Sequence, residues 1–201
     1  NLSINTPVII IIVQLFQNIV QNTPSYTKTN FLENNTMRRR DLFRFPAKTP
    51  LIVYFRCPPD TYLAAVNPDN IGQVDDVWPY RYPNSHFYFA TLISNGLSYG
   101  LYSLDKKLLA WIFLNQYNFL CHLHCETSHR RKGYAEFLIK TVVNDSLKVG
   151  NDVYGFVVPD NEKAFGIFSK LGFQFVDDGA WLNVKNNFDW PDSSVGSNPA
   201  I

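Results

Sequence analysis

The chain has 201 residues, of which 46% are hydrophobic and 17% are charged, a balance typical of a globular protein rather than a disordered one. Its length allows one domain with a sizeable core and excludes two large domains. The formal net charge of +1 argues against a surface devoted to nucleic acid, so any electrostatic binding must come from a local cluster of basic residues.

Residues 1–55 show no regular pattern and are predicted to form an irregular N-terminal segment, either a fragment or an upstream extension that is not part of the domain. The aliphatic run at 8–13 is too short for the roughly 20 apolar residues of a membrane-spanning helix, so we expect no membrane span. No basic residue precedes the run, which makes it a poor secretory signal, and a buried helix or strand is expected there. The basic run 38–40 could contact phosphates, but a solvated surface patch is the simpler interpretation.

From residue 56 to 184 the apolar pattern predicts one domain of strands and helices, followed by a loose tail over 185–201. Strands are expected at 62–66, 97–102, 108–114, 119–126 and 154–158, and a hairpin of 173–176 and 181–184 around 177–179. Two short helices are expected within 70–95, and longer ones at 132–149 and 161–171. Short turns join most of the strands, which favours an α/β fold with a mixed, mostly antiparallel twisted sheet and flanking helices.

A cluster of basic residues stands where one strand ends and the longest helix begins. The segment reads Arg130-Arg131-Lys132-Gly133-Tyr134-Ala135. The first turn of a helix has unpaired amides and the positive end of the helix dipole, which together suit a phosphate. Gly133 would let a phosphate approach the backbone closely, and the small Ala135 keeps the turn uncrowded. The sequence therefore predicts a phosphate-binding loop.

This arrangement resembles the GNAT superfamily of acyl-CoA N-acyltransferases over residues 62–184. The resemblance is carried by the basic loop and by two further segments, Val158-Pro159-Asp160-Asn161 and Phe168-Ser169-Lys170-Leu171-Gly172-Phe173. Within the superfamily, the chain looks like the glycine N-acyltransferase-like branch, on the segment Leu109-Ala110-Trp111-Ile112 and on Trp78 followed by Tyr82.

The resemblance implies a GNAT fold in which the parallel strands at 120–126 and 154–158 splay apart around acyl-CoA, or acetyl-CoA, as co-substrate. It implies a small amine or amino acid such as glycine as acceptor, which attacks the thioester directly. Backbone groups near His124 and Cys125 would bind pantetheine and stabilise the oxyanion. The implied cofactor-binding residues are His124, Cys125, Arg130, Arg131, Lys132, Gly133, Tyr134, Ala135, Asn161 and Phe168.

The chain departs from the superfamily pattern at two positions. Many GNAT enzymes have a tyrosine acid where this chain has Phe168, and vertebrate glycine N-acyltransferases have a proposed glutamate base where it has Ser128. We predict that His124 is the base, with Glu126 as its partner or substitute, because a neutral imidazole can accept a proton at neutral pH. Two alternatives remain open: the histidines only satisfy hydrogen bonds beside the core, or the protein is a catalytically silent acyl-CoA-binding or interaction module.

The histidines His122 and His124, flanked by Cys121 and Cys125, also suggest a metal site. Strand alternation is expected to send the cysteines to one face and the histidines to the other, so that they cannot share one tetrahedral ion. No third ligand for the histidine pair is evident in the sequence. We therefore predict no metal.

The acceptor is expected to bind at the aromatic loop 78–86, where Arg81 and Tyr82 are the candidate substrate residues. Arg81 could pair with a substrate carboxylate, although a solvated surface arginine is the simpler interpretation. The expected partners are a small-molecule amine or amino acid and no nucleic acid. Three cysteines in a chain of this length indicate a reducing compartment, so we expect an intracellular, cytoplasmic or mitochondrial protein.

Overall fold

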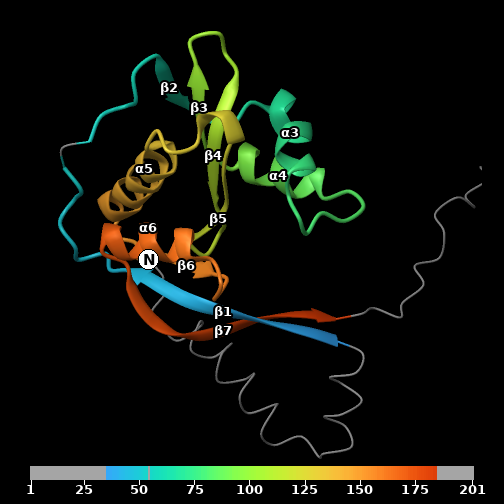
Figure 1. Cartoon of the computed structure of the whole chain (residues 1–201), viewed down its shortest axis with the longest axis vertical. Coiled ribbons are helices and arrows are strands. Elements are labelled where there is room, and N and C mark those ends of the chain that lie inside the picture. Colours follow the sequence, from blue (N-terminus) through green and yellow to red (C-terminus); the bar gives the residue numbers. More distant parts are fainter. Residues whose placement is uncertain (1–34, 54, 185–201) are drawn as a thin grey trace, which may run out of the picture. The chain divides into compact units, whose positions relative to one another are not determined.

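The computed structural model describes residues 35–53 and 55–184, and these form a seven-stranded sheet in the order β2-β3-β4-β5-β6-β1-β7 (Figure 1). The strands are β1 (Asn35–Phe45), β2 (Thr61–Ala64), β3 (Ser98–Ser103), β4 (Leu108–Leu114), β5 (Phe119–Cys125), β6 (Val153–Val157) and β7 (Gln174–Val184). The α-helices are α3 (Ile71–Asp76), α4 (His86–Ser94), α5 (Tyr134–Lys148) and α6 (Glu162–Leu171), with short 3-10 turns η1 (Pro68–Asn70) and η2 (Thr127–His129). The chain divides into two compact units, and all of these helices lie in the larger one, residues 40–178.

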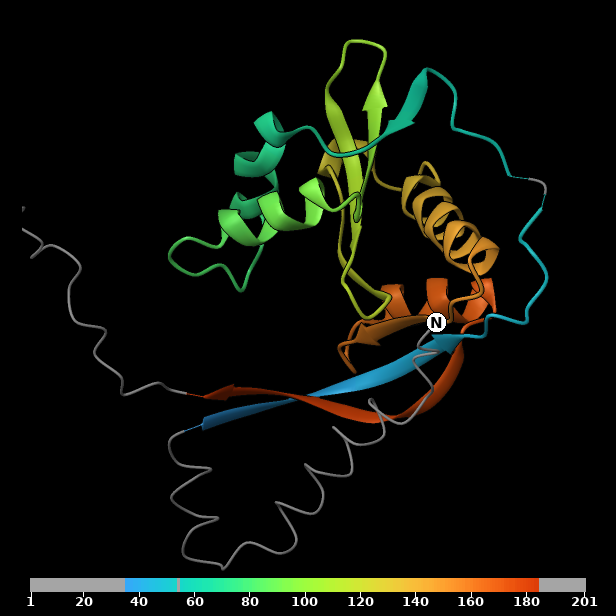
Figure 2. The same cartoon turned by 180° about the vertical axis from the view of Figure 1, so that it is seen from behind.

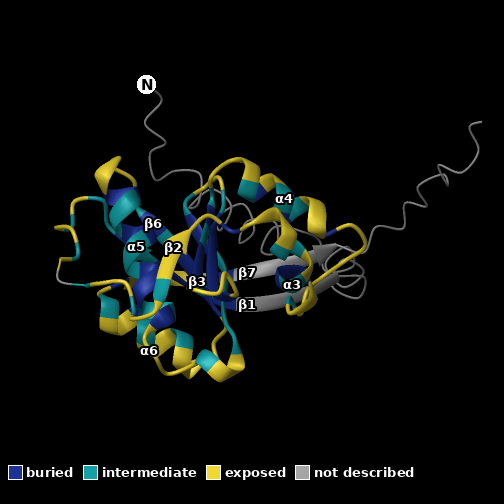
Figure 3. Ribbon diagram, turned by 90° about the horizontal axis from the view of Figure 1, so that it is seen from above, coloured by how far each residue is buried: buried dark blue, intermediate teal, exposed yellow. Residues whose placement is uncertain are grey.

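Helices cover both faces of the sheet. Strand β4 is buried along its whole length, and its side chains alternate between two hydrophobic clusters. Leu109 and Ile112 belong to the cluster that includes α5 and α6, whereas Trp111 and Phe113 belong to the cluster that includes α3 and α4. The views from the front and from behind both show α5 on one side of β4 and the α3–α4 pair on the other (Figures 1 and 2). Seen from above, β3 is largely buried, whereas most of β2 and the outer turns of the helices are exposed (Figure 3).

The α5/α6 face shows why the sequence forms these elements. The apolar stripe of α5 includes Leu138, Ile139, Val142 and Val143, all at 0% exposure, as expected for a helix that packs one face on a sheet. On α6, the ring of Phe168 lies directly on β6, where a Cβ built on Gly155 would come within 2.5 Å of it. A glycine is therefore required in the strand for this helix to approach so closely.

Strands β5 and β6 run parallel but pair over two positions only, Phe119 with Tyr154 and Leu120 with Gly155. Beyond Leu120, β5 continues to Cys125 without a register partner on β6. The predicted mixed, mostly antiparallel sheet with a splayed parallel pair is thus confirmed. Most predicted helices and strands also lie within two residues of their observed bounds.

Three expectations for the ends of the domain need correction. Part of the segment predicted to be irregular is strand β1, and the predicted hairpin at 173–184 is one continuous strand, β7. The turn-forming residues at 177–179 stay extended because β7 has β1 as a neighbour along the sheet, a partner from the other end of the sequence. Arg40, expected in a solvated patch, is only 7% exposed. The apolar run at 8–13 and the tail at 185–201 lie outside the described residues.

None of the helices among the described residues is both long enough and apolar enough to cross a membrane.

Candidate active site

A β-bulge in β5 determines where the histidines of this strand lie. His122 has a left-handed backbone (φ +52°), and the β4–β5 register shifts beside it. The extra residue moves the pleat by one position, so that His122 joins Cys121 and His124 on the α3/α4 face, while Leu123 and Cys125 pack toward α5. The prediction that cysteines and histidines occupy opposite faces is therefore wrong for Cys121, whereas Cys125 does lie opposite the two histidines.

The imidazole of His122 is enclosed by aromatic rings. Its centroid lies 4.8 Å from that of Trp78, 4.9 Å from Phe89, 5.4 Å from Tyr88 and 6.1 Å from Phe113. Burial lowers its pKa from an ordinary value of 6.5 to about 4, because the charged form loses hydration among these rings. The ring is therefore neutral at pH 7, and it packs as part of the aromatic cluster.

His122 should make the stability of the fold depend on pH. Below about pH 6.5 the unfolded chain binds a proton at His122 that the folded chain accepts only near pH 4. The free energy of unfolding should therefore fall by roughly 3 kcal/mol from this residue as pH drops through that window. Denaturant titrations at several pH values would measure the slope. His122→Asn, in which asparagine tolerates a left-handed backbone, should reduce this slope. A slope equal to that of the wild type would contradict the assignment.

His124, the predicted base, stacks on the indole of Trp111, with ring centroids 4.6 Å apart and planes 24° from parallel. Burial lowers its pKa, the carboxylate of Glu126 opposes that shift, and the guanidinium of Arg130 adds to it. The net direction is downward, so at neutral pH the imidazole is unprotonated and able to accept a proton. The stacking on Trp111 fixes the plane of the ring.

Glu126 is held by a residue that the sequence did not point to. Gln73 on α3 donates from Nε2 to Glu126 Oε1 at 2.7 Å and to the carbonyl of Leu108 at 3.2 Å. This amide ties α3 to the end of β5 and keeps the carboxylate beside His124. Gln73 and Glu126 are 53 positions apart in the chain, and no local pattern signals such a contact.

The predicted phosphate-binding loop is open at the start of α5. Gly133 is the N-cap with φ +80°, and Arg131 before it has φ +66°. A Cβ built on Gly133 would meet no atom within 4 Å, and this N-cap offers no side-chain acceptor to the first-turn amides. Arg130 donates from Nε to the carbonyl of Cys125 at 3.1 Å, which links the loop to the end of β5. The loop thus presents unpaired amides to an open surface next to three cations.

Strand β5 runs on past the end of its ladder with β6, which leaves backbone groups of β5 without a ladder partner on that side. The N–H of Glu126 donates to Leu109 on β4 at 2.9 Å. Successive N–H groups of a strand point to opposite edges, so that of Cys125 points away from β4, toward the side of β6. Register pairing with β6 has already ended at Leu120.

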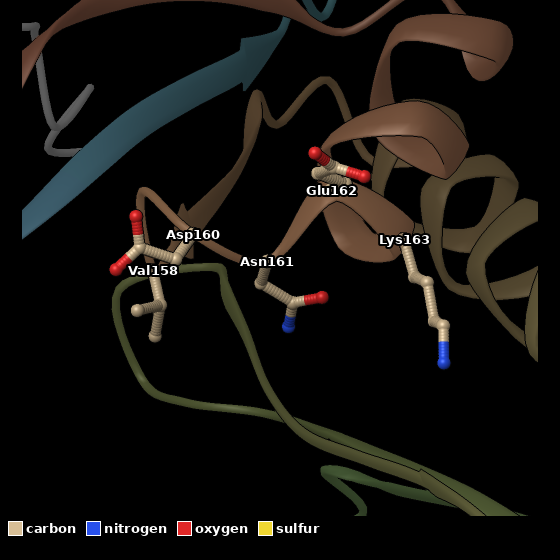
Figure 4. A pocket seen from close by; sticks show the side chains of 5 residues that line it. All are labelled: Val158, Asp160, Asn161, Glu162 and Lys163. Carbon is tan, nitrogen blue, oxygen red and sulfur yellow. The ribbon is translucent and has the colours of Figure 1, made fainter.

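The two remaining predicted cofactor residues have clear structural roles. Asn161 caps α6 by accepting from the amide of Ala164 at 3.1 Å, and it lines a surface hollow with Val158, Asp160, Glu162 and Lys163. In this hollow the side chains of Asn161 and Lys163 point to one side, and that of Glu162 points away (Figure 4). Phe168 is 6% exposed and packs on Phe43 and Phe173. A cofactor contact at these residues stays a prediction.

The predicted acceptor residues, Arg81 and Tyr82, contact neighbouring residues of the same region of the chain. Arg81 forms ion pairs with Asp75 at 3.3 Å and Asp76 at 2.8 Å. Tyr82 is 53% exposed and lies against Trp78, with ring centroids 5.8 Å apart. Because Trp78 also contacts His122, the loop adjoins β5 on the face that carries the two histidines. No three His, Cys, Asp or Glu side chains among the described residues are grouped to hold a metal.

Comparison with known proteins identifies the fold. The model of the FR47-like protein family matches residues 98–182, from β3 to β7. A GCN5-related N-acetyltransferase from Sphaerobacter thermophilus has a TM-score of 0.59 at 12% identity, covering 85% of this chain and 65% of its own. The chain has the GNAT fold. The described sheet with its parting strands and flanking helices is the GNAT architecture.

Two further solved structures are similar to this chain. A Drosophila protein solved by structural genomics has a TM-score of 0.72 at 16% identity, over 85% of this chain and 59% of its own. Arabidopsis thaliana NAA60, in complex with a bisubstrate analogue, has a TM-score of 0.52 at 18% identity, over 61% of this chain and 95% of its own. The chain spans about three fifths of the Drosophila protein. A search of curated proteins found no match.

Proposed function

We propose that the protein is an acyl-CoA-dependent N-acyltransferase that moves an acetyl or longer acyl group to a small amine inside the cell. The observation that carries this proposal is the parting of β5 and β6 directly before an open helix N-terminus flanked by three basic residues. The resemblance to the glycine N-acyltransferase-like branch adds amino acids such as glycine to the candidate acceptors.

The residues around the gap suit acyl-CoA. The amides of the first turn of α5 would hold the pyrophosphate, with Arg130, Arg131 and Lys132 supplying positive charge. The open space at Gly133 would let the phosphates reach the backbone. The N–H of Cys125 would donate to pantetheine or to the thioester oxygen in the gap. When bound, the thioester supplies an activated acyl carbon.

His124 would remove the proton from the acceptor amine. As the amine nitrogen bonds to the acyl carbon and the carbon–sulfur bond breaks, the imidazole takes the proton and the sulfur keeps the electron pair. Glu126, held by Gln73, would offset the charge that His124 then carries. The leaving thiolate needs no dedicated acid, because the pKa of a thiol is about 8.5. The absence of a tyrosine at Phe168 is therefore compatible with turnover.

The proposal is tested by a screen of acyl-CoAs against small amines and amino acids, following free thiol and the mass of the product. We expect amine-dependent thiol release that is unchanged by a chelator. Binding of CoA in calorimetry without amine-dependent thiol release would instead favour a catalytically silent acyl-CoA-binding module. The exposed Ser128, hydrogen-bonded to His129 at 2.9 Å, motivates that alternative, since it stands where a glutamate base would be expected.

A further inference from the structure

We infer that the acceptor is a primary amine with an apolar or aromatic group and no carboxylate. This inference rests on the proposed function and narrows it. It comes from the side chains around loop 78–86 on the α3/α4 face, beside His122 and His124.

The two arginines that contact this loop are both engaged within the protein. Arg81 bonds to Asp75 and Asp76, and Asp75 also accepts from Ser85 Oγ. Asp75 is 6% exposed, so taking Arg81 away to bind a ligand would leave a buried carboxylate without its cation. Arg40, 7% exposed, donates to the hydroxyl of Tyr80 at 3.2 Å. A carboxylate on the acceptor would have to compete with these contacts.

The charge of the surrounding segment points the same way. Residues 67–95 carry three carboxylates and one guanidinium, and therefore a formal charge of −2 with histidine neutral. Next to His124, Glu126 adds a fourth carboxylate and Arg130 a second guanidinium, so the formal charge of this set stays at −2. Like charges repel across a binding surface, so this environment disfavours an acceptor that carries a carboxylate.

Aromatic side chains at the loop would contact the apolar part of the acceptor. Trp78 lies against Tyr82 and stacks on Tyr88, with ring centroids 5.8 and 6.2 Å apart. Tyr80 is 45% exposed on the same loop. Such rings attract both apolar groups and cations.

The test compares three acceptors that share one side chain: 2-phenylethylamine, phenylalaninamide and phenylalanine. The first lacks the carboxyl group, the second neutralises it, and the third carries it. After subtraction of the uncatalysed reaction, we expect kcat/KM for phenylalanine to be at least about tenfold below that for the other two. Phenylalaninamide separates the effect of charge from that of branching at the α-carbon.

Two variants sharpen the comparison. Asp76→Asn, at a side chain that is 69% exposed, should narrow the difference in kcat/KM between phenylalaninamide and phenylalanine. Asp105→Asn in the β3–β4 turn should leave this difference unchanged. Equal or higher kcat/KM for phenylalanine in the wild type would overturn the inference, as would selective loss of phenylalanine turnover in Arg81→Gln. Either result leaves the proposed function standing. If no amine, including glycine, releases thiol, the proposed function itself fails and the inference fails with it.

Discussion

Replacing His124 with alanine is expected to lower amine-dependent turnover by roughly 10²–10⁴-fold, the usual contribution of a positioned acid–base group. Only the neutral imidazole accepts a proton, so the wild-type rate should rise with pH through the pKa of His124. Burial places that pKa below its ordinary value. The limb that belongs to His124 should therefore lie on the acid side of an ordinary histidine. A pH–rate profile of kcat/KM measures the limb.

Glu126→Gln distinguishes the two candidate bases. If His124 is the base, the limb disappears in His124→Ala and persists, shifted to lower pH, in Glu126→Gln, because the carboxylate favours the protonated imidazole. If Glu126 is the base, the limb survives His124→Ala and vanishes in Glu126→Gln. Near-wild-type turnover and pH dependence in both variants would show that neither residue is the base, and that the amine loses its proton to solvent.

Substituting valine for Gly133 is expected to weaken CoA binding by roughly 10²-fold. The branched side chain would occupy the space through which the pyrophosphate must reach the amides of α5, and losing one hydrogen bond to a charged group costs about 1.5–3 kcal/mol. Arg130→Ala should reduce affinity less, by about tenfold, since this exposed side chain acts through charge and through its bond to Cys125. Calorimetric titration with CoA measures both.

Gly133→Val also affects stability because of the backbone conformation at Gly133, and a glycine at the other end of α5 serves as a control. A side chain at φ +80° costs roughly 1–2 kcal/mol in any L-residue, so Gly133→Val will also lower stability. Gly150, just after the other end of α5, has φ +77° and equally open surroundings. Gly150→Val should therefore lose similar stability and keep full CoA affinity. Unchanged affinity in a folded Gly133→Val protein would refute the phosphate-binding loop.

Elements formed by local periodicity were predictable from the sequence, and features that depend on distant partners were not. The stripe of α5 and the buried strand β4 follow from spacing alone. The bulge at His122 was missed because a left-handed backbone is uncommon for any residue other than glycine, and nothing in the sequence around His122 signals one. Strand β1 was missed because arginines interrupt its apolar alternation and its pairing partner, β6, follows about 110 residues later.

In the candidate site, too, the local segment was predictable and the contacts between distant segments were not. Its phosphate-binding loop is one contiguous segment, and the motif fell at the observed start of α5 within two residues. The surroundings of the base are assembled from separate elements: Gln73 from α3, Trp111 from β4 and Trp78 from the loop after α3. Arg81 looked available for a substrate because its partners, Asp75 and Asp76, are ordinary surface residues in the sequence, and only the folded loop brings them onto the guanidinium.

The early end of the β5–β6 ladder also predicts an unusual pattern of amide hydrogen exchange. The N–H of Cys125 lies within a strand, yet it faces the side on which pairing among the described strands has ended. In the free protein its proton should exchange with solvent about as fast as one in a loop, while the neighbouring N–H of Glu126, bonded to Leu109, stays protected. A bound pantetheine would complete the missing row of hydrogen bonds. Binding of the ligand should thus slow the amide hydrogen exchange of Cys125.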